Sequence, residues 1–212
     1  MADVRRTFSG LEAAAVRANL ERVRERIGDD VAVLAAVKYV PVDELPILAE
    51  AGIELVGENR AQELVDKRAA HADLFTWDFI GQMQSRKVKD VAPEVRLIHS
   101  VASDSVLHKL EANPAPEVLV QVNVAGEEGK EGVAPADLAD FIARCPVPVT
   151  GLSTMPPFAP DAEDNRRHFA RLAELAGEHG LQRLSMGTTQ DYWVAAQEGA
   201  TIVRVGTALY ES

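Results

Sequence analysis

The chain has 212 residues, of which 47% are apolar, 26% charged and 5% aromatic, as in an ordinary soluble globular protein. Its formal net charge of −11 disfavours the basic face by which proteins bind nucleic acids or anionic membranes. The one cysteine, Cys145, cannot form an internal disulfide, and no apolar stretch has the length of a membrane span or the form of a signal peptide. We therefore expect a cytoplasmic protein with no nucleic-acid or membrane partner.

Short apolar runs alternate with amphipathic segments along the chain. A helix over residues 8–27, with Ser9 as its N-cap, comes first, and the apolar run after it has no polar alternation, which is typical of a strand buried on both faces. In chain order, the predicted strands cover 31–37, 53–59, 77–81, 96–101, 117–124, 147–153, 181–187 and 201–210, and the helices between them cover 41–52, 60–72, 83–92, 103–112, 136–145, 163–180 and 191–199.

Alternating buried strands and helices with short connections predict right-handed crossovers and a parallel sheet. Eight such strands in one chain close most naturally into a (β/α)8 barrel of the TIM type. We expect a single domain over 1–212, in which residues 1–30 form an extra helix that packs on the barrel in place of a full eighth helix. A doubly wound open sheet is the alternative, and it is disfavoured because no GxGxxG turn follows the first strand.

Polar residues gather where the predicted strands end, and in a parallel barrel these ends form the rim on which sites lie. The rim residues are Lys38, Gly57 to Asn59, Ile80, Gly81, Gln84, Ser85, Asn123, Ser153 to Met155, Ser185 to Thr189 and Arg204 to Thr207. Because polar groups are costly inside a barrel, their convergence predicts a site at this rim.

Two neighbouring strand ends have features of an anion site. SMGTT, residues 185–189, lies between a strand and a helix that Asp191 starts, so its backbone N–H groups and hydroxyls can face a phosphate. VGTA, residues 205–208, adds a glycine and a hydroxyl after the last strand, where barrels frequently bind phosphate. The alternative is that Ser185, Thr188 and Thr189 are turn and capping residues.

Lys38 lies in the otherwise apolar segment VAVLAAVKYVP, residues 31–41, which sets it apart from the other lysines. Partial desolvation and nearby cations favour the neutral amine, which is the form that attacks an aldehyde. A phosphate site on the same rim then indicates a phosphorylated aldehyde, and pyridoxal 5′-phosphate (PLP) is the commonest such cofactor. The alternative is a lysine whose amine extends from the strand end into solvent.

Six segments, in the order AVKYVP, VGENRAQEL, WDFIGQMQSRK, NVAGEEGKEG, LSMGTTQDY and VRVGTALY, resemble the pyridoxal phosphate homeostasis protein family, whose members are similar to the barrel domain of alanine racemase. The match runs from about residue 31 to the C-terminus. The resemblance implies a PLP-bearing barrel in which Lys38 forms the internal aldimine. It also implies ring contacts from Asn59 and Met155, a pyridine-nitrogen contact from Arg204, and phosphate contacts from Ser185, Gly187, Thr188, Gly206 and Thr207.

The sequence departs from the family pattern at several positions. Asp78 stands where the family usually has a histidine, and Arg86 replaces an asparagine. Thr188 and Thr189 replace a methionine and a serine, so that the second exchange keeps a hydroxyl for the phosphate while the first changes the pocket wall. Three residues match the family's loop after the fifth strand, where we expect only a surface loop: Glu127, Lys130 and Gly132.

An arginine at the pyridine nitrogen leaves that nitrogen unprotonated and disfavours transamination. Racemisation needs acid–base groups on both faces of the bound substrate. In alanine racemases one of them is a tyrosine placed with the help of an additional domain, which we expect to be absent here. Tyr39 follows Lys38 directly, so strand alternation predicts that it points to the opposite side. We therefore expect no enzyme but a carrier or buffer in PLP (vitamin B6) homeostasis, with indirect effects on amino-acid metabolism.

Two alternatives remain. One is a low-activity PLP-dependent amino-acid racemase or lyase, and the other is a class I aldolase-like barrel with a Schiff-base lysine and no cofactor. No metal site is expected, because the five histidines are scattered without paired ligand spacing. PLP is the expected ligand, apo PLP enzymes are expected transient partners, and the protein is expected to be a monomer.

Overall fold

Eight parallel strands close into a barrel in the computed structural model, which describes residues 7–127 and 129–211. The strands follow one another around the barrel in sequence order, and β1 pairs with both β2 and β8. Their bounds are β1 (Ala32–Ala36), β2 (Leu55–Glu58), β3 (Thr76–Phe79), β4 (Leu97–Val101), β5 (Glu117–Gln121), β6 (Val149–Ser153), β7 (Arg183–Thr188) and β8 (Ile202–Val205). The predicted barrel is confirmed, and the open sheet is excluded.

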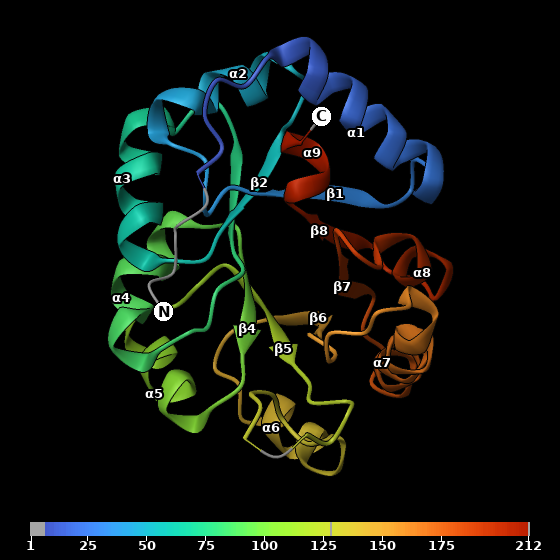
Figure 1. The fold of residues 1–212 in the computed structure, drawn as a ribbon. Helices are drawn as coiled ribbons and strands as arrows, with labels where there is room; N and C mark the ends of the chain where they lie inside the picture. Colours follow the sequence, from blue (N-terminus) through green and yellow to red (C-terminus); the bar gives the residue numbers. More distant parts are fainter. Residues whose placement is uncertain (1–6, 128, 212) are drawn as a thin grey trace.

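Helices form an outer ring around the strands (Figure 1). Their bounds are α1 (Ala13–Ile27), α2 (Leu45–Glu50), α3 (Ala61–His71), α4 (Val88–Val91), α5 (Asp104–Ala112), α6 (Leu138–Ala143), α7 (Arg166–Glu178), α8 (Tyr192–Gln197) and α9 (Thr207–Tyr210). Several of them begin with a 3-10 turn, at 42–44, 85–87, 135–137 and 162–165, and another such turn at 92–94 follows α4. Among the residues described, no helix is both long and apolar enough to cross a lipid bilayer.

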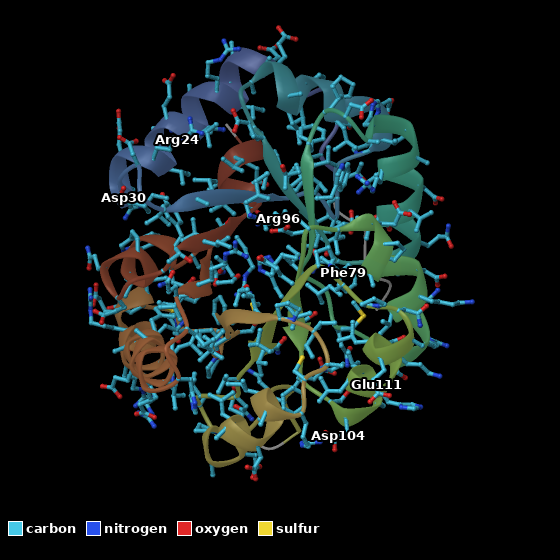
Figure 2. All side chains as sticks on the ribbon, turned by 180° about the vertical axis from the view of Figure 1, so that it is seen from behind. Arg24, Asp30, Phe79, Arg96, Asp104 and Glu111 are labelled. Atoms are coloured by element: carbon cyan, nitrogen blue, oxygen red, sulfur yellow. The ribbon has the colours of Figure 1, made fainter. Side chains whose placement is uncertain are left out.

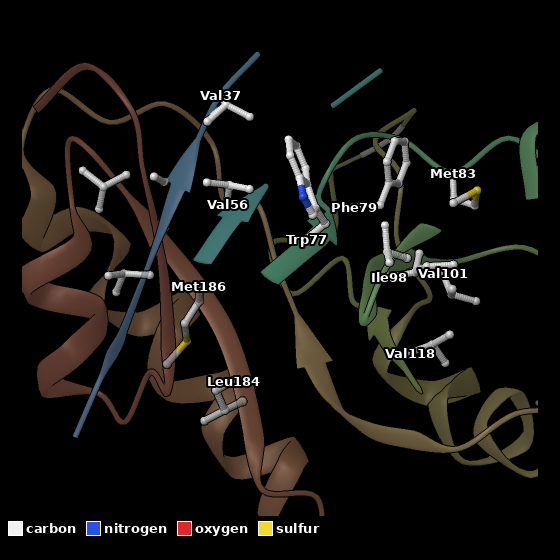
Figure 3. Packing of buried hydrophobic residues seen from close by; sticks show 14 of the residues in the cluster. Val37, Val56, Trp77, Phe79, Met83, Ile98, Val101, Val118, Leu184 and Met186 are labelled. Carbon is white, nitrogen blue, oxygen red and sulfur yellow. The ribbon is translucent and has the colours of Figure 1, made fainter. Parts of the chain in front are cut away.

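Two apolar clusters hold the barrel together. The larger cluster joins strand residues to helix residues such as Leu64. Figure 3 shows two of its strand residues, Trp77 and Ile98. The smaller cluster comprises Leu34, Leu97, Leu119 and Ile202, which are buried inside the barrel below the rim. Gly57 makes room for it, because a Cβ at that position would lie 2.4 Å from Cδ2 of Leu34. Burial on both faces is why these strands show no polar alternation.

The first helix begins later than predicted. α1 starts at Ala13, with Glu12 as its N-cap and no side-chain capping bond, so the predicted start at residue 8 and the Ser9 cap are wrong. The carboxylate of Glu44 accepts hydrogen bonds from the backbone N–H groups of Gly10 (2.6 Å) and Leu11 (3.1 Å). These bonds hold the preceding segment outside the helix. Residues 1–6 of the predicted N-terminal segment lie outside the described residues.

The last strand is shorter than predicted. β8 ends at Val205, and the one-turn helix α9 replaces the predicted strand over residues 207–210. Helix α1 packs against α2, α8 and α9, and the Asn19 side chain of α1 donates hydrogen bonds to the carbonyl oxygens of Leu209 (3.0 Å) and Glu211 (3.1 Å). The N-terminal helix and this short turn therefore lie together where a full eighth helix would pack, in a single domain.

Candidate functional site

A cavity of about 680 Å³ opens at the carboxyl ends of the strands. Most of the predicted site residues line it: Lys38, Asn59, Met155, Thr188, Arg204, Gly206 and Thr207. Tyr39, Gln82, Gln121, Glu131 and Thr189 complete much of its wall. Ser185 and Gly187, which were also predicted, are not among the residues that line this cavity. The geometry thus brings together residues from opposite ends of the sequence.

Lys38 lies in the turn that follows β1, where its side chain is half-buried. Its Nζ is 4.7 Å from the centre of the Tyr39 ring, and both side chains line the cavity. The prediction that Tyr39 points to the opposite side is therefore wrong. Because β1 ends at Ala36, the alternation of a strand does not extend to residues 38 and 39.

A buried ion pair lies beneath Lys38. Lys67 of α3 is 6% exposed and Glu58 of β2 is fully buried, and Lys67 Nζ lies 2.6 Å from Glu58 Oε2. The same Nζ donates to the carbonyl oxygen of Val37 at 2.7 Å. Glu58 Oε1 accepts from the backbone N–H of Asn59 at 2.6 Å and of Arg60 at 3.1 Å. Sequence reasoning missed Lys67, which lies among polar neighbours in the chain.

Arg204 of β8 places a buried guanidinium on the cavity wall. It is 7% exposed, and its Nη2 donates to the carbonyl oxygen of Thr154 at 2.7 Å and contacts Met155 Sδ at 3.0 Å. Burial lowers the pKa of Arg204 to about 10, against the opposing charge of Asp191, so the side chain is cationic at neutral pH. Its Nε and the Oδ1 of Asn59 are buried without a hydrogen-bond partner among the described residues.

Backbone N–H groups converge on one hydroxyl at the end of β8. Thr189 Oγ1 accepts from the backbone N–H of Gly206 at 3.1 Å and of Ala208 at 3.4 Å. The Thr189 oxygen therefore occupies a position that two backbone N–H groups reach, and both Thr189 and Thr207 line the cavity. Such a convergence suits an anion.

The neighbouring turn after β7 is held by Asp191. Its Oδ1 accepts from the backbone N–H of Thr188 at 2.7 Å and from the Thr188 hydroxyl at 3.1 Å. Gly187 has φ +85°, and a Cβ there would lie 2.5 Å from Cβ of Ala195. The Thr188 hydroxyl therefore stabilises the turn, as the alternative interpretation of this segment expects.

Ser185 lies inside the barrel at one end of a buried polar chain. Its hydroxyl is 2.8 Å from His99 Nδ1, and His99 Nε2 is 3.0 Å from Asp78 Oδ2. Arg96 completes the chain with two bonds to Asp78, at 3.0 and 2.6 Å, and Figure 2 shows Arg96 near the middle of the ring of strands. Asp78, one of the positions expected to depart from the family pattern, thus bonds to both His99 and Arg96.

Burial and hydrogen bonding shift the pKa of both His99 and Asp78. Burial lowers the pKa of His99, and the charges of Arg204 and Arg96 act in the same direction, against the hydrogen bond to Asp78. Burial alone would raise the pKa of Asp78, but the hydrogen bonds from His99 and Arg96 outweigh it and lower the pKa. At neutral pH His99 is therefore neutral and Asp78 is ionised.

The loop after β5 forms part of the cavity wall. Asn123 ties it down, because its side-chain amide donates to the carbonyl oxygen of Glu127 at 2.9 Å and its Oδ1 accepts from the Glu127 N–H at 3.3 Å. Glu127 also pairs with Lys130 at 2.5 Å. The expectation of a plain surface loop is incomplete, since Glu131 of this loop lines the cavity. The described residues contain no cluster of three or more His, Cys, Asp or Glu side chains suited to a metal ion.

Fold and site together define a single barrel of the alanine racemase type, and the family model described as "Alanine racemase, N-terminal domain" matches residues 11–212. The chain is 39% identical to the pyridoxal phosphate homeostasis protein of Aquifex aeolicus, over 90% of this chain and 95% of that protein. It is 39% identical to the protein of the same name from Pseudomonas aeruginosa, over 93% and 92% of the two chains. The chain therefore belongs to the pyridoxal phosphate homeostasis protein family, and the resemblance predicted from its motifs is confirmed.

Solved structures agree with this assignment. PipY of Synechococcus elongatus, solved with PLP bound, is 29% identical and has a TM-score of 0.81, over 92% of this chain and all of that one. Alanine racemase of Clostridium difficile, at 14% identity and a TM-score of 0.76, shares the fold over 95% of this chain and 58% of its own length.

Proposed function

We propose that the protein binds PLP in the cavity at the barrel rim and acts in PLP homeostasis as a carrier or buffer. The observation that supports this most directly is the shared cavity of Lys38 and Arg204, whose Nε is buried without a partner among the described residues. The family relatives named for PLP homeostasis and the PLP-bound structure of PipY support the same assignment.

The residues present fit the cofactor. Lys38 would supply the amine that holds the aldehyde group of PLP. Arg204 supplies a donor for the pyridine nitrogen, and the unpartnered Oδ1 of Asn59 supplies an acceptor beside the ring. The amide groups of Gly206 and Ala208, with the Thr189 hydroxyl, suit the phosphate. Thr207 and Met155 line the same cavity.

The phosphate contacts predicted for Ser185 and Gly187 stay predictions. The Ser185 hydroxyl already bonds to His99, and the backbone of Gly187 forms the turn that positions Thr188 and Thr189. We assign Ser185 a supporting place beneath the phosphate and Gly187 a conformational one.

Bound PLP would supply an electron sink, and Arg204, a cation at neutral pH, would weaken it by keeping the pyridine nitrogen from being protonated. This favours binding and release over turnover. One observation supports the alternative function, a low-activity amino-acid racemase or lyase. Tyr39 lines the cavity beside Lys38, and its hydroxyl is a group that can donate or accept a proton.

Exchange with other proteins is the physiological role that we propose. Met155 is 52% exposed at the cavity, so the site is open enough for a bound ligand to leave towards a recipient. We propose transient contacts with apo PLP enzymes by a monomeric protein in the cytoplasm.

A spectroscopic and kinetic experiment tests this function. Protein purified from cells is expected to absorb visible light, and borohydride reduction is expected to leave a pyridoxyl group on Lys38, detected by mass spectrometry. An unmodified Lys38 would instead support the aldolase-like alternative. Transfer of PLP to an apo-enzyme without loss of the α-proton of added amino acids to D₂O supports the carrier, whereas rapid deuterium exchange supports the racemase or lyase.

A further inference from the structure

The Glu58 and Lys67 side chains, which form a buried ion pair, each make hydrogen bonds to the backbone next to a residue of the candidate cofactor site. Lys67 Nζ holds the carbonyl of Val37, the residue before Lys38, and Glu58 Oε1 holds the N–H groups of Asn59 and Arg60. The pair therefore ties the chain after β1, which contains Lys38, to the chain after β2, which contains Asn59.

Burial of this pair is exceptional for the molecule. Among the ion pairs between a lysine or arginine and a carboxylate in the described residues, it is the one with both side chains less than a tenth exposed, at 7% and 0%. Buried ion pairs are weak sources of stability, since apolar residues of similar volume often do as well or better. A role in specifying geometry explains the pair better than a role in stability.

Lys38 depends on such a support because its own side chain is long and flexible. If Lys38 bonds to a ligand whose other end is fixed, the Lys38 Cα must be held at a set distance from that ligand. Here the peptide group before Lys38 is fixed by the charge-assisted hydrogen bond from Lys67 to the Val37 carbonyl. The backbone N–H groups of Gly206 and Ala208, which suit an anion, follow β8 and bond to Thr189. The hydrogen bonds of the ion pair go instead to Val37, Asn59 and Arg60, although the charge of Glu58 also acts on Tyr210 of α9.

We infer that Glu58 and Lys67 are positioning residues that hold Lys38 in reach of the aldehyde of a bound ligand and align Asn59 with its ring. This inference rests on the proposed function. It assigns the pair to the aldehyde end of the site and leaves the phosphate end independent of it.

The test compares two ligands in one variant. Lys67→Met keeps the length of the aliphatic part of the side chain and removes the charged amine, and we expect PLP affinity to fall about tenfold or more. Pyridoxamine 5′-phosphate has the same ring and phosphate but no aldehyde. Its affinity is expected to fall by less than about threefold, because only the Asn59 contact with the ring changes and Lys38 forms no bond to it. Equilibrium dialysis measures both affinities.

Arg68→Met is the matched control. Arg68 is the next residue of the same helix and pairs with Glu94 at 2.7 Å, away from Val37 and Asn59, so its loss is expected to leave both affinities unchanged. If Lys67→Met does not fold, Glu58→Gln combined with Lys67→Met removes both buried charges and is expected to fold while showing the same selective loss.

Three results separate the possibilities. Unchanged PLP affinity in the variant overturns the inference, and so does an equal loss for both ligands, which would indicate collapse of the whole site. Failure of the unmutated protein to bind PLP at Lys38 overturns the proposed function instead.

Discussion

His99 and Ser185 are 86 residues apart in the chain, yet the His99 Nδ1 lies 2.8 Å from the Ser185 hydroxyl inside the barrel. On its other side, His99 Nε2 bonds to Asp78. Because an ionised carboxylate only accepts hydrogen bonds, His99 donates from Nε2, and its neutral Nδ1 accepts the Ser185 proton. The tautomer of a buried histidine and the direction of a serine hydroxyl are thus set by Asp78.

Acid is expected to destabilise the folded protein through His99 and Asp78. The folded pKa of His99 lies below its ordinary value of 6.5, so from about pH 6.5 downwards the unfolded state binds a proton that the folded state does not, and stability falls. The folded pKa of Asp78 is also lowered, so its contribution is lost below its ordinary value of 3.8. Urea unfolding at pH 7 and pH 5 measures the first effect.

His99→Gln is expected to reduce the difference between the two pH values, because the amide does not titrate. His108→Gln is the matched control, since His108 is largely exposed on α5 and its replacement should leave the pH dependence intact. An identical pH dependence in the His99→Gln variant contradicts the assignment.

Replacement of Lys38 is expected to abolish the visible colour of the purified protein. Lys38→Ala removes the amine, so PLP content should fall to about a tenth or less of that of the unmutated protein. Because Lys38 is half-buried in the turn after β1, the free energy of unfolding should change by less than about 1 kcal/mol. Absorbance and thermal unfolding of the same sample check both. Retained colour would place the aldehyde elsewhere.

Arg204→Met is expected to separate binding from stability. The guanidinium is buried with an unpartnered Nε. A methionine, which reaches about as far as the Nε, removes that buried charge and also the bond to the Thr154 carbonyl. We expect the free energy of unfolding to change by no more than about 1 kcal/mol in either direction, while PLP affinity falls about tenfold or more. Chemical denaturation and dialysis measure the two quantities; a loss of stability without a loss of affinity would refute a role at the ring.

Gly187→Ala is expected to destabilise the turn after β7 by about 2 kcal/mol or more. The residue has a positive φ, and the added methyl group would meet Ala195 at 2.5 Å. Gly177→Ala is the contrasting control, because Gly177 lies in α7 with open space around its Cβ position and should gain up to about 1 kcal/mol. Thermal unfolding of both variants tests the pair, and equal midpoints would show that the turn tolerates a side chain.

The barrel and most of its rim were predictable because they depend on local patterns. Short apolar runs with a polar residue at or near the end indicate a strand and its contribution to the site. Lys38 follows such a run directly, and Arg204 is the last residue but one of β8. Parallel topology then places such residues on one rim without further information.

Features that depend on contacts between distant residues were not predictable. Glu44 fixes where α1 begins from 33 residues away, and Lys67 reaches the carbonyl of Val37 from 30 residues away. The place of Tyr39 depended on the residue at which β1 ends, and strand boundaries are poorly fixed by the local pattern.

The smaller apolar cluster, Leu34, Leu97, Leu119 and Ile202, occupies the interior of the barrel below the rim. PLP bound at the rim would therefore enter and leave from the same side, because the cluster blocks passage through the barrel. In the proposed transfer, a recipient that docks over that side would shield PLP from competing amines in solution.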